Sequence, residues 1–388
     1  MGNELKTERA AQTMPSTQAT LSTRSTRMAQ TLQAARSIEQ TSMDLRLWGL
    51  VGVMAVSGSL AACGGGDEDA SEPEAQAILS VKAYVTSELE KLVNASSDLE
   101  VLAPTPDADG WTMASDADAV LDMRAAWRNI RAPYERIEGA IAVLFPDLDA
   151  STDERYDGFI EFETDDNLFD DQGVTGVHAV ERILWADAHP EHVVQFESAL
   201  PNYREARFPS NEAEASDFKA KLAHRLAIDT TTMRDTFRPL ALDSSAAFRG
   251  VIGSVEEQFE KVSLAASGED ESRYAQFTLG DMRNNLEGGH EIFSAFKPWL
   301  LTTAGGEALA DEIQRGFSEL RSVYDALPGD ALPDVPATWN PDAPSSEDLL
   351  TPYGALWQRL STESDPDQPA SLVSKMLAAA TALGLPQI

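Results

Sequence analysis

A histidine and a glutamate stand three residues apart at His178 and Glu181, within the segment Gly-Val-His-Ala-Val-Glu-Arg. On a helix, residues three apart share one face, so this imidazole and this carboxylate can bind the same metal ion. The pattern alone is weak, because a chain with 5 histidines and 64 acidic residues contains about one such pair by chance. A solvated pair on a helix surface is the simpler interpretation of this motif by itself.

A second acidic pair, Glu135 and Glu138, has the same spacing. The residues around it are partly apolar, which favours a position facing a bundle interior. Carboxylates in such a position must be protonated, paired or bound to metal, since an unpaired buried charge is strongly unfavourable. Together with a histidine from a neighbouring helix, they provide nitrogen and oxygen ligands suited to iron, zinc or copper. The alternative is an exposed acidic face that pairs with Arg131 or Arg136.

Glu287 and His290 form a third candidate, a Glu-x-x-His pattern. Di-iron helical bundles need two such motifs and two further glutamates, and the sequence contains the motif once. The double glycine between the two residues also weakens a helix at this point. The pair is a minor ligand candidate, and an ordinary helix surface explains it better.

The charge balance limits the kinds of partner. The 388 residues include 30 lysines and arginines against 64 aspartates and glutamates, which gives a net charge of -34. Such a chain repels nucleic acid and attracts cations. A single cysteine excludes an intrachain disulfide and a cysteine-based zinc cluster. The sequence has no His-Glu-x-x-His motif, which argues against a zincin peptidase.

The single cysteine, Cys63, ends a short apolar run and is followed by glycines. The run begins at Leu47, after Arg46, and is too short for a spanning helix, which needs about 20 residues. A secretory signal typically has a basic start, a short apolar stretch and small residues before the cleavage site. This segment has these features, and its ending resembles a bacterial lipobox. We therefore predict that Cys63 is lipidated and anchors the protein to a membrane. A free, buried cysteine is the alternative.

This prediction divides the amino-terminal part of the chain. Residues 43–63 are the expected lipoprotein signal peptide, and residues 64–73 are expected to form a flexible tether. Residues 1–42 are rich in Ser, Thr, Gln and Arg and lack apolar periodicity. We expect them to be either a disordered leader or a segment upstream of the true start, which would then be Met43 or Met28.

Helical periodicity dominates residues 74–388. Apolar residues recur at spacings of three and four, and strand-like alternation is nearly absent. The sequence therefore predicts an all-α fold, most simply two packed up-and-down helical bundles. An acidic stretch from Pro146 to Gly173 is expected to be irregular. The predicted helices cover residues 74–99, 116–144, 174–186, 189–200, 213–237, 244–267, 273–302, 306–327, 346–361 and 369–383.

A series of motifs extends over most of this region. In order, they are Ala126-Trp127-Arg128, Tyr134 to Glu138, Phe145 to Asp149 with Asp153 and Arg155, Gly176 to Glu181 with Leu184-Trp185, and Tyr274, Leu279, Asp281, Asn285 and Gly288. This series resembles the imelysin-like family, which includes the EfeO-type periplasmic iron-uptake proteins. Several ordered motifs together are far more specific than any one of them.

The resemblance implies two helical bundles with a metal site in the cleft between them. Carried over residue by residue, the ligands are Glu135, Glu138, Asp153, His178 and Glu181. Iron is the expected ion, with zinc or copper as alternatives. One extra residue between the second glutamate and the aspartate leaves Asp149 as the alternative to Asp153. Glu269 or Glu271 is a further candidate for the cleft, and the resemblance does not choose between them.

The expected function is that of a lipid-anchored periplasmic protein that captures iron or another transition metal for uptake. The resemblance implies an iron permease and a periplasmic peroxidase as partners, and the net negative charge argues against nucleic acid as a partner. Gly64 after Cys63, in place of an aspartate, favours the outer membrane. Two alternatives stay open. One is a metallopeptidase with Glu138 as general base, and the other is a surface lipoprotein that binds a polymer or another protein and holds a structural metal.

Overall fold

The computed structural model describes residues 71–385. Cys63, the predicted signal peptide and the predicted leader lie outside these residues, as does most of the predicted tether. Every regular element between Ser71 and Leu385 is a helix and no strand occurs there, which confirms the all-α prediction. Within the same range, no helix combines the length and the apolar character that crossing a membrane requires.

The helices differ widely in length, and one of them is a π-helix. In chain order the elements are α2 (Glu72–Leu102), α3 (Ala117–Glu135), α4 (Glu138–Leu144), α5 (Pro146–Asp153), α6 (Tyr156–Ile160), α7 (Gly176–Leu184), α8 (Glu191–Glu197), α9 (Glu212–Asp217), the π-helix η1 (Phe218–Ala223), α10 (His224–Phe237), α11 (Ser244–Leu264), α12 (Thr278–Leu300), α13 (Gly306–Asp325), the 3-10 helix η2 (Asp348–Leu350), α14 (Pro352–Glu363) and α15 (Leu372–Ala382).

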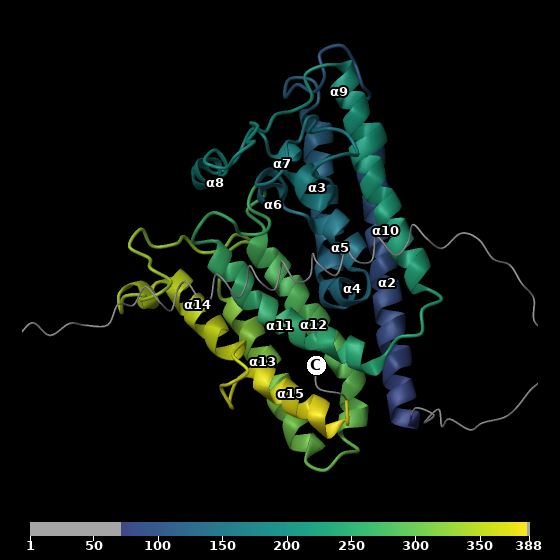
Figure 1. Cartoon of the computed structure of the whole chain (residues 1–388), viewed down its shortest axis with the longest axis vertical. Coiled ribbons are helices and arrows are strands. Elements are labelled where there is room, and N and C mark those ends of the chain that lie inside the picture. The colour runs from purple at the N-terminus through teal and green to yellow at the C-terminus, as the bar shows by residue number, and fades with distance from the viewer. Residues whose placement is uncertain (1–70, 386–388) are drawn as a thin grey trace, which may run out of the picture. The chain divides into compact units, whose positions relative to one another are not determined.

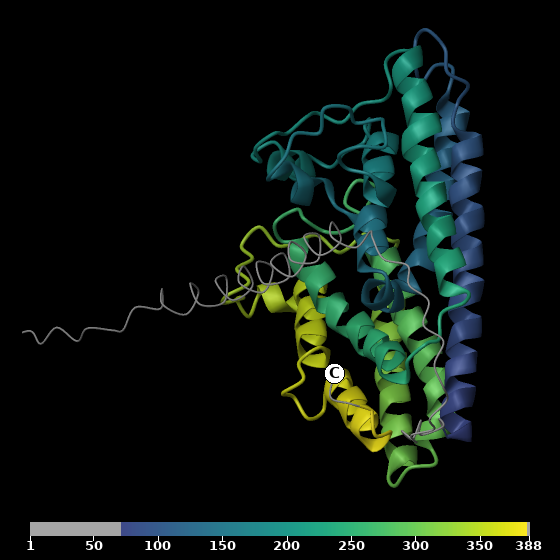
Figure 2. The same ribbon diagram turned by 45° about the vertical axis from the view of Figure 1, so that its right-hand side comes forward.

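The first bundle is formed by α2, α3 and α10 (Figure 1). α2 carries apolar residues at spacings of three and four on one face, which is buried: Val81, Val85, Leu89 and Leu92. α10 runs antiparallel to α2 and lies beside it in both views (Figure 2). α7 packs against α3, where the Trp127 indole N–H donates a 2.9 Å hydrogen bond to the Val177 carbonyl.

The second bundle comprises α11 to α15. Phe248 of α11 and Phe296 of α12 meet edge to face, with ring centroids 5.0 Å apart. Tyr324 of α13 donates a 2.7 Å hydrogen bond to the Gln258 side-chain oxygen of α11. α12 also packs against α2 and α3, and α11 packs against α4, so the two bundles meet along these helices. The arrangement agrees with the two bundles predicted from the sequence.

The long helix predicted to carry Glu135 and Glu138 is interrupted between them. α3 ends at Glu135 and α4 begins at Glu138. A proline lies in the last turn of α3, and the Ile137 N–H donates to the Tyr134 carbonyl three residues back, at 2.9 Å. The chain tightens at this point and then resumes as a helix. The two glutamates therefore flank a break in the backbone.

The prediction of an irregular acidic stretch from Pro146 to Gly173 is wrong for its first part, where α5 and α6 lie, whereas residues 161–173 form turns and bends without a helix. Pro146 occupies the first turn of α5, where a missing N–H costs nothing, and Asp147 and Asp149 in the same turn interact favourably with the helix dipole. Several helix boundaries also differ from the prediction. α2 begins at Glu72, inside the predicted tether, and α12 begins at Thr278 rather than at residue 273.

Candidate metal centre

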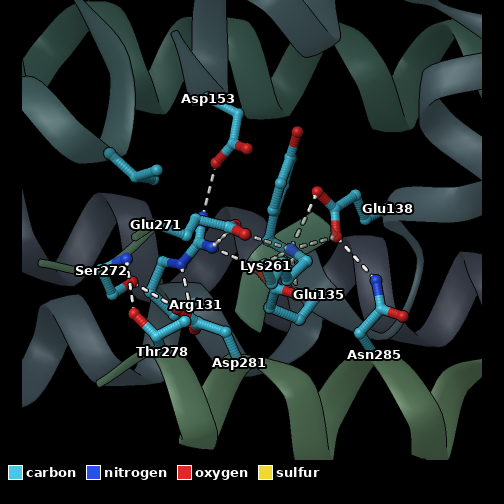
Figure 3. A network of polar contacts seen from close by, with 12 residues as sticks. Arg131, Glu135, Glu138, Asp153, Lys261, Glu271, Ser272, Thr278, Asp281 and Asn285 are labelled. Atoms are coloured by element: carbon cyan, nitrogen blue, oxygen red, sulfur yellow. Dashed lines mark hydrogen bonds and ion pairs between the residues drawn. The ribbon is translucent and has the colours of Figure 1, made fainter. Parts of the chain in front are cut away.

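A network of charged side chains fills the junction between the bundles (Figure 3). Arg131 and Lys261 lie at its centre, surrounded by carboxylates. The network comprises Arg131 and Glu135 at the end of α3, Glu138 at the start of α4, Asp153 at the end of α5, His178 and Glu181 on α7, Lys261 on α11, Glu271 and Ser272 before α12, and Asp281 and Asn285 on α12.

Two glycines allow the helices to approach one another at this junction. Gly176, the first residue of α7, has φ +85°, and a Cβ there would lie 2.2 Å from the Thr152 carbonyl oxygen of α5. Gly288 of α12 lies against the break between α3 and α4, where a Cβ would lie 2.0 Å from the Arg136 carbonyl oxygen. The first contact places His178 beside the end of α5, and the second brings α12 to the two glutamates.

His178 is buried and is held from one side by Glu181. Its Nδ1 lies 2.9 Å from one Glu181 oxygen, and the other Glu181 oxygen accepts the backbone N–H groups of Tyr274 and Ala275 at 2.9 and 2.7 Å. The opposite ring atom, Nε2, lies 3.3 Å from Asp153 Oδ1, but it makes no hydrogen bond. Burial opposes protonation of the ring, but the Asp153 charge and the contacts with Asp153 and Glu181 outweigh it and raise the pKa of His178 to about 9, so a metal ion at Nε2 would have to replace a proton.

Arg131 is completely buried and contacts four carboxylates. Its Nη1 donates to Asp153 at 2.5 Å, its Nε donates to Asp281 at 3.2 Å, and its Nη2 donates to both Glu135 and Glu271. The pKa of Arg131 is raised well above its usual value, because the surrounding acids outweigh the effect of burial. The guanidinium is therefore a fixed positive charge within the acidic network.

Lys261 is the second internal cation, with 4% of its surface exposed. Its ammonium nitrogen lies 3.1 Å from a Glu135 oxygen and 3.0 Å from a Glu138 oxygen, and it also contacts Glu271. Asn285 donates to the same Glu138 carboxylate at 2.7 Å. Glu271 thus bridges the two cations, with one oxygen on Arg131 and the other on Lys261.

The two cations do not neutralise all the carboxylates. Burial raises the pKa of Glu135 well above its usual value, and the charges of Glu138 and Glu271 raise it further. Burial also raises the pKa of Asp281, to about 7. Burial would raise the pKa of Glu271 as well, but the two neighbouring cations outweigh it and hold that pKa well below the usual range. Five carboxylates, Glu135, Glu138, Asp153, Glu271 and Asp281, thus contact two permanent cations, and either protonation of some of these acids or a further cation can compensate the formal excess.

Two groups of side chains within the described residues have the spacing of metal ligands. Asp153, His178 and Glu271 each offer one ligand atom, and these atoms lie within 4.8 Å of one another. Glu135, Glu271 and Asp281 satisfy the same criterion, but Arg131 already contacts all three. The first group is the one that offers a ring nitrogen without a hydrogen-bond partner.

A cavity of about 240 Å³ lies beside this group. Asp153, Lys261 and Glu271 form part of its wall, and two acidic side chains of α11, Glu257 and Glu260, line it as well. A cation in this cavity can reach the carboxylates of Asp153 and Glu271 without unfolding either bundle. The acidic lining favours cations over anions along this route.

The sequence model of the imelysin family, also termed peptidase M75, matches residues 80–361. The chain belongs to the imelysin family. Relatives of this imelysin include the iron uptake system component EfeO of Escherichia coli O6:K15:H31 (strain 536 / UPEC), which is 28% identical over 247 residues, or 64% of this chain and 52% of the relative. EfeO of Yersinia pseudotuberculosis serotype I (strain IP32953) is 26% identical over 262 residues, or 66% and 56%. The chain spans about half the length of these curated relatives.

The fold of this imelysin is shared with a solved structure. An imelysin-like protein from Psychrobacter arcticum 273-4 matches with a TM-score of 0.52 at 12% sequence identity. The match covers 81% of this chain and 96% of that chain. At this identity the similarity concerns the fold, and the chemistry of the site has to be argued from the residues of this chain.

The structure brings most of the predicted ligands of this imelysin into one network. Glu135, Glu138, Asp153 and His178 are linked through Arg131, Lys261 and the Asp153–His178 contact. Glu181 lies on the other side of the histidine ring, and its two oxygens contact that ring and the backbone.

The alternatives that the sequence left open have distinct positions. Asp153 lies next to His178, whereas Asp149 lines the same cavity and accepts the Tyr134 hydroxyl at 2.5 Å. Glu271 enters the network, whereas Glu269 accepts a hydrogen bond from Ser267 outside it.

The two cations at the centre of the network were not predicted from the sequence. Arg131, one of two expected surface partners of the acidic pair, does contact Glu135, but the contact is buried. The spacing of four residues between Arg131 and Glu135 was the sequence signal that could have indicated this pair. No local pattern marks Lys261, because its partners are distant in the sequence. The minor candidate His290 packs against Phe317, with ring centroids 5.2 Å apart, and makes no contact with the network.

Proposed function

We propose that this imelysin captures a transition-metal ion, with iron as the first candidate, for an iron uptake system. Asp153, His178 and Glu271 would be its protein ligands. The observation that carries the proposal is the orientation of His178: its buried Nε2 has no hydrogen-bond partner and lies beside the Asp153 carboxylate. One nitrogen and two carboxylate ligands suit iron, and they also suit zinc or copper.

The remaining predicted ligands take supporting roles in this proposal. Glu181 fixes the orientation of the His178 ring through Nδ1, as carboxylate partners of metal-binding histidines commonly do. Glu135 and Glu138 hold Lys261 and add negative charge near the ion. Of the five ligands predicted from the sequence, the proposal retains Asp153 and His178. It adds Glu271 as the third ligand.

Export and anchoring complete the proposal. Lipidation at Cys63 would tether the protein in the periplasm, with the outer membrane favoured, and delivery would be to an iron permease working with a periplasmic peroxidase. The support is the lipobox-like sequence and the relatives, which are named as components of an iron uptake system. Mass spectrometry of the protein purified from membranes tests the anchor, since lipidation adds a diacylglycerol-sized mass to a chain that begins at Cys63.

Calorimetric titration of the purified protein with ferrous, manganous, zinc and cupric ions tests the metal site. We expect wild type to bind at least one of these ions and the His178→Ala variant to lose that binding. His224→Ala is the matched control, because His224 is an exposed histidine that pairs with Glu100 on the surface. Equal binding by wild type and the His178→Ala variant would contradict the assignment. Metal-dependent cleavage of an unfolded substrate, lost with the same variant, would favour the metallopeptidase alternative.

A further inference from the structure

Lys261 occupies an unusual position for a lysine at a site that we propose for a cation. Its ammonium group lies among Glu135, Glu138 and Glu271 (Figure 3). Its side chain also forms part of the cavity wall. A positive charge is therefore already present where an ion entering from the cavity would arrive.

Glu271 belongs both to this lysine and to the proposed ligand group. One of its oxygens contacts Lys261, and the other contacts Arg131. A metal ion that binds Glu271 must therefore compete for an oxygen that already contacts one of the two cations. Arg131 is completely buried and contacts four carboxylates, whereas Lys261 ends a flexible four-carbon chain beside the cavity. Lys261 is thus the cation that can move aside.

We infer that the Lys261 ammonium is a tethered competitor of the incoming ion for Glu271, and that it sets both the affinity of the site and its preference for multivalent over monovalent cations. This inference rests on the proposed function. A divalent or trivalent ion interacts with the carboxylates more strongly than an ammonium group does, whereas a monovalent ion gains nothing by displacing one. The same ammonium can return to Glu271 when the ion leaves, which favours release to a partner.

The test compares the affinity for Mn²⁺ of wild type, Lys261→Met and the control Lys219→Met. Lys219 is also partly buried, but it donates to the Ala103 carbonyl at 2.6 Å, away from the acidic network. We expect the Lys261→Met variant to bind Mn²⁺ about ten- to a hundredfold more tightly, because a positive charge next to the ion is removed. The Lys219→Met variant should bind as wild type does.

A second arm measures selectivity. Mn²⁺ binding is repeated with potassium chloride in place of tetramethylammonium chloride at constant ionic strength, so that screening stays the same. Potassium should weaken Mn²⁺ binding by the Lys261→Met variant and leave wild type unaffected. Equal potassium sensitivity in the two proteins would overturn the claim about selectivity.

The single variant leaves Glu135 without its lysine, and this can prevent folding. The Lys261→Met/Glu135→Gln double variant removes one positive and one negative charge together, and its reference is Glu135→Gln alone. Tighter Mn²⁺ binding by the double variant than by its reference supports the inference, and equal or weaker binding overturns it. If wild type binds Mn²⁺ through His178 but loss of Lys261 does not tighten binding, this inference alone fails. If wild type binds no metal ion, the proposed function fails with it.

Discussion

Glu181 Oε2 lies 2.9 Å from His178 Nδ1, while Glu181 Oε1 accepts two backbone N–H groups just before α12. The carboxylate therefore ties α7 to the segment that also carries Glu271. Because Glu181 accepts a hydrogen bond from the Nδ1–H group, Nε2 is the ring atom that can bind a metal ion. One buried glutamate thus sets both the orientation of the ring and the position of a second ligand.

Replacing Glu181 with Gln should weaken metal binding about ten- to a hundredfold. The amide can donate to Nδ1, which would place the ring proton on Nε2, where it opposes the metal. Isothermal titration with the ion that wild type binds measures the effect. Glu191→Gln, an exposed glutamate in the first turn of α8, is the control and should leave the affinity unchanged. An unchanged affinity in Glu181→Gln would rule out this orienting role.

Arg131 should be essential for stability, because four carboxylates depend on it for compensation. Removing one partner of a buried ionic network typically costs about 3–5 kcal/mol. We expect Arg131→Met to lower the free energy of unfolding by that amount, measured by urea denaturation at neutral pH. Arg315→Met, at an exposed position of α13, should change it little. If both substitutions lowered the free energy of unfolding by similar amounts, the buried guanidinium would have no special role in stability.

Replacing Gly288 of α12 or Gly253 of α11 with alanine should change the stability of the protein in opposite directions. At Gly288, a Cβ would lie 2.0 Å from the Arg136 carbonyl oxygen, so Gly288→Ala must push α12 away from the α3–α4 break, at a cost of about 3 kcal/mol. At Gly253 of α11, the nearest atom would be 4.0 Å away, so Gly253→Ala should stabilise by about 0.5–1 kcal/mol. Thermal unfolding compares the two. A stabilised Gly288→Ala variant would contradict the close packing described for the site.

The sequence indicated the helices well where apolar residues repeat at three and four, as in α2, because burial of one face decides that structure. It did not reveal the break after Glu135, because a proline such as Pro133 in the preceding turn can either kink a helix or end it. The acidic composition concealed α5, because acidic stretches are common in loops. Asp147 and Asp149 nevertheless lie in the first turn of this helix, where negative charge is favourable.

The candidate site was only partly predictable for a similar reason. His178 and Glu181 lie on one helix, so their spacing alone placed them together. Lys261 and Glu271 lie more than a hundred residues from Glu135, and nothing in the local sequence connects them. Charged residues on several helices also look like solvated surface in the sequence, and only the packing of the two bundles buries them.

The most direct test of the account is an anomalous diffraction map from crystals of the full chain grown with manganous or ferrous ions, recorded at the absorption edge of the metal. The account predicts a peak about 2.0–2.2 Å from His178 Nε2, between the carboxylates of Asp153 and Glu271. A map with metal bound only elsewhere, and none at His178, would contradict it.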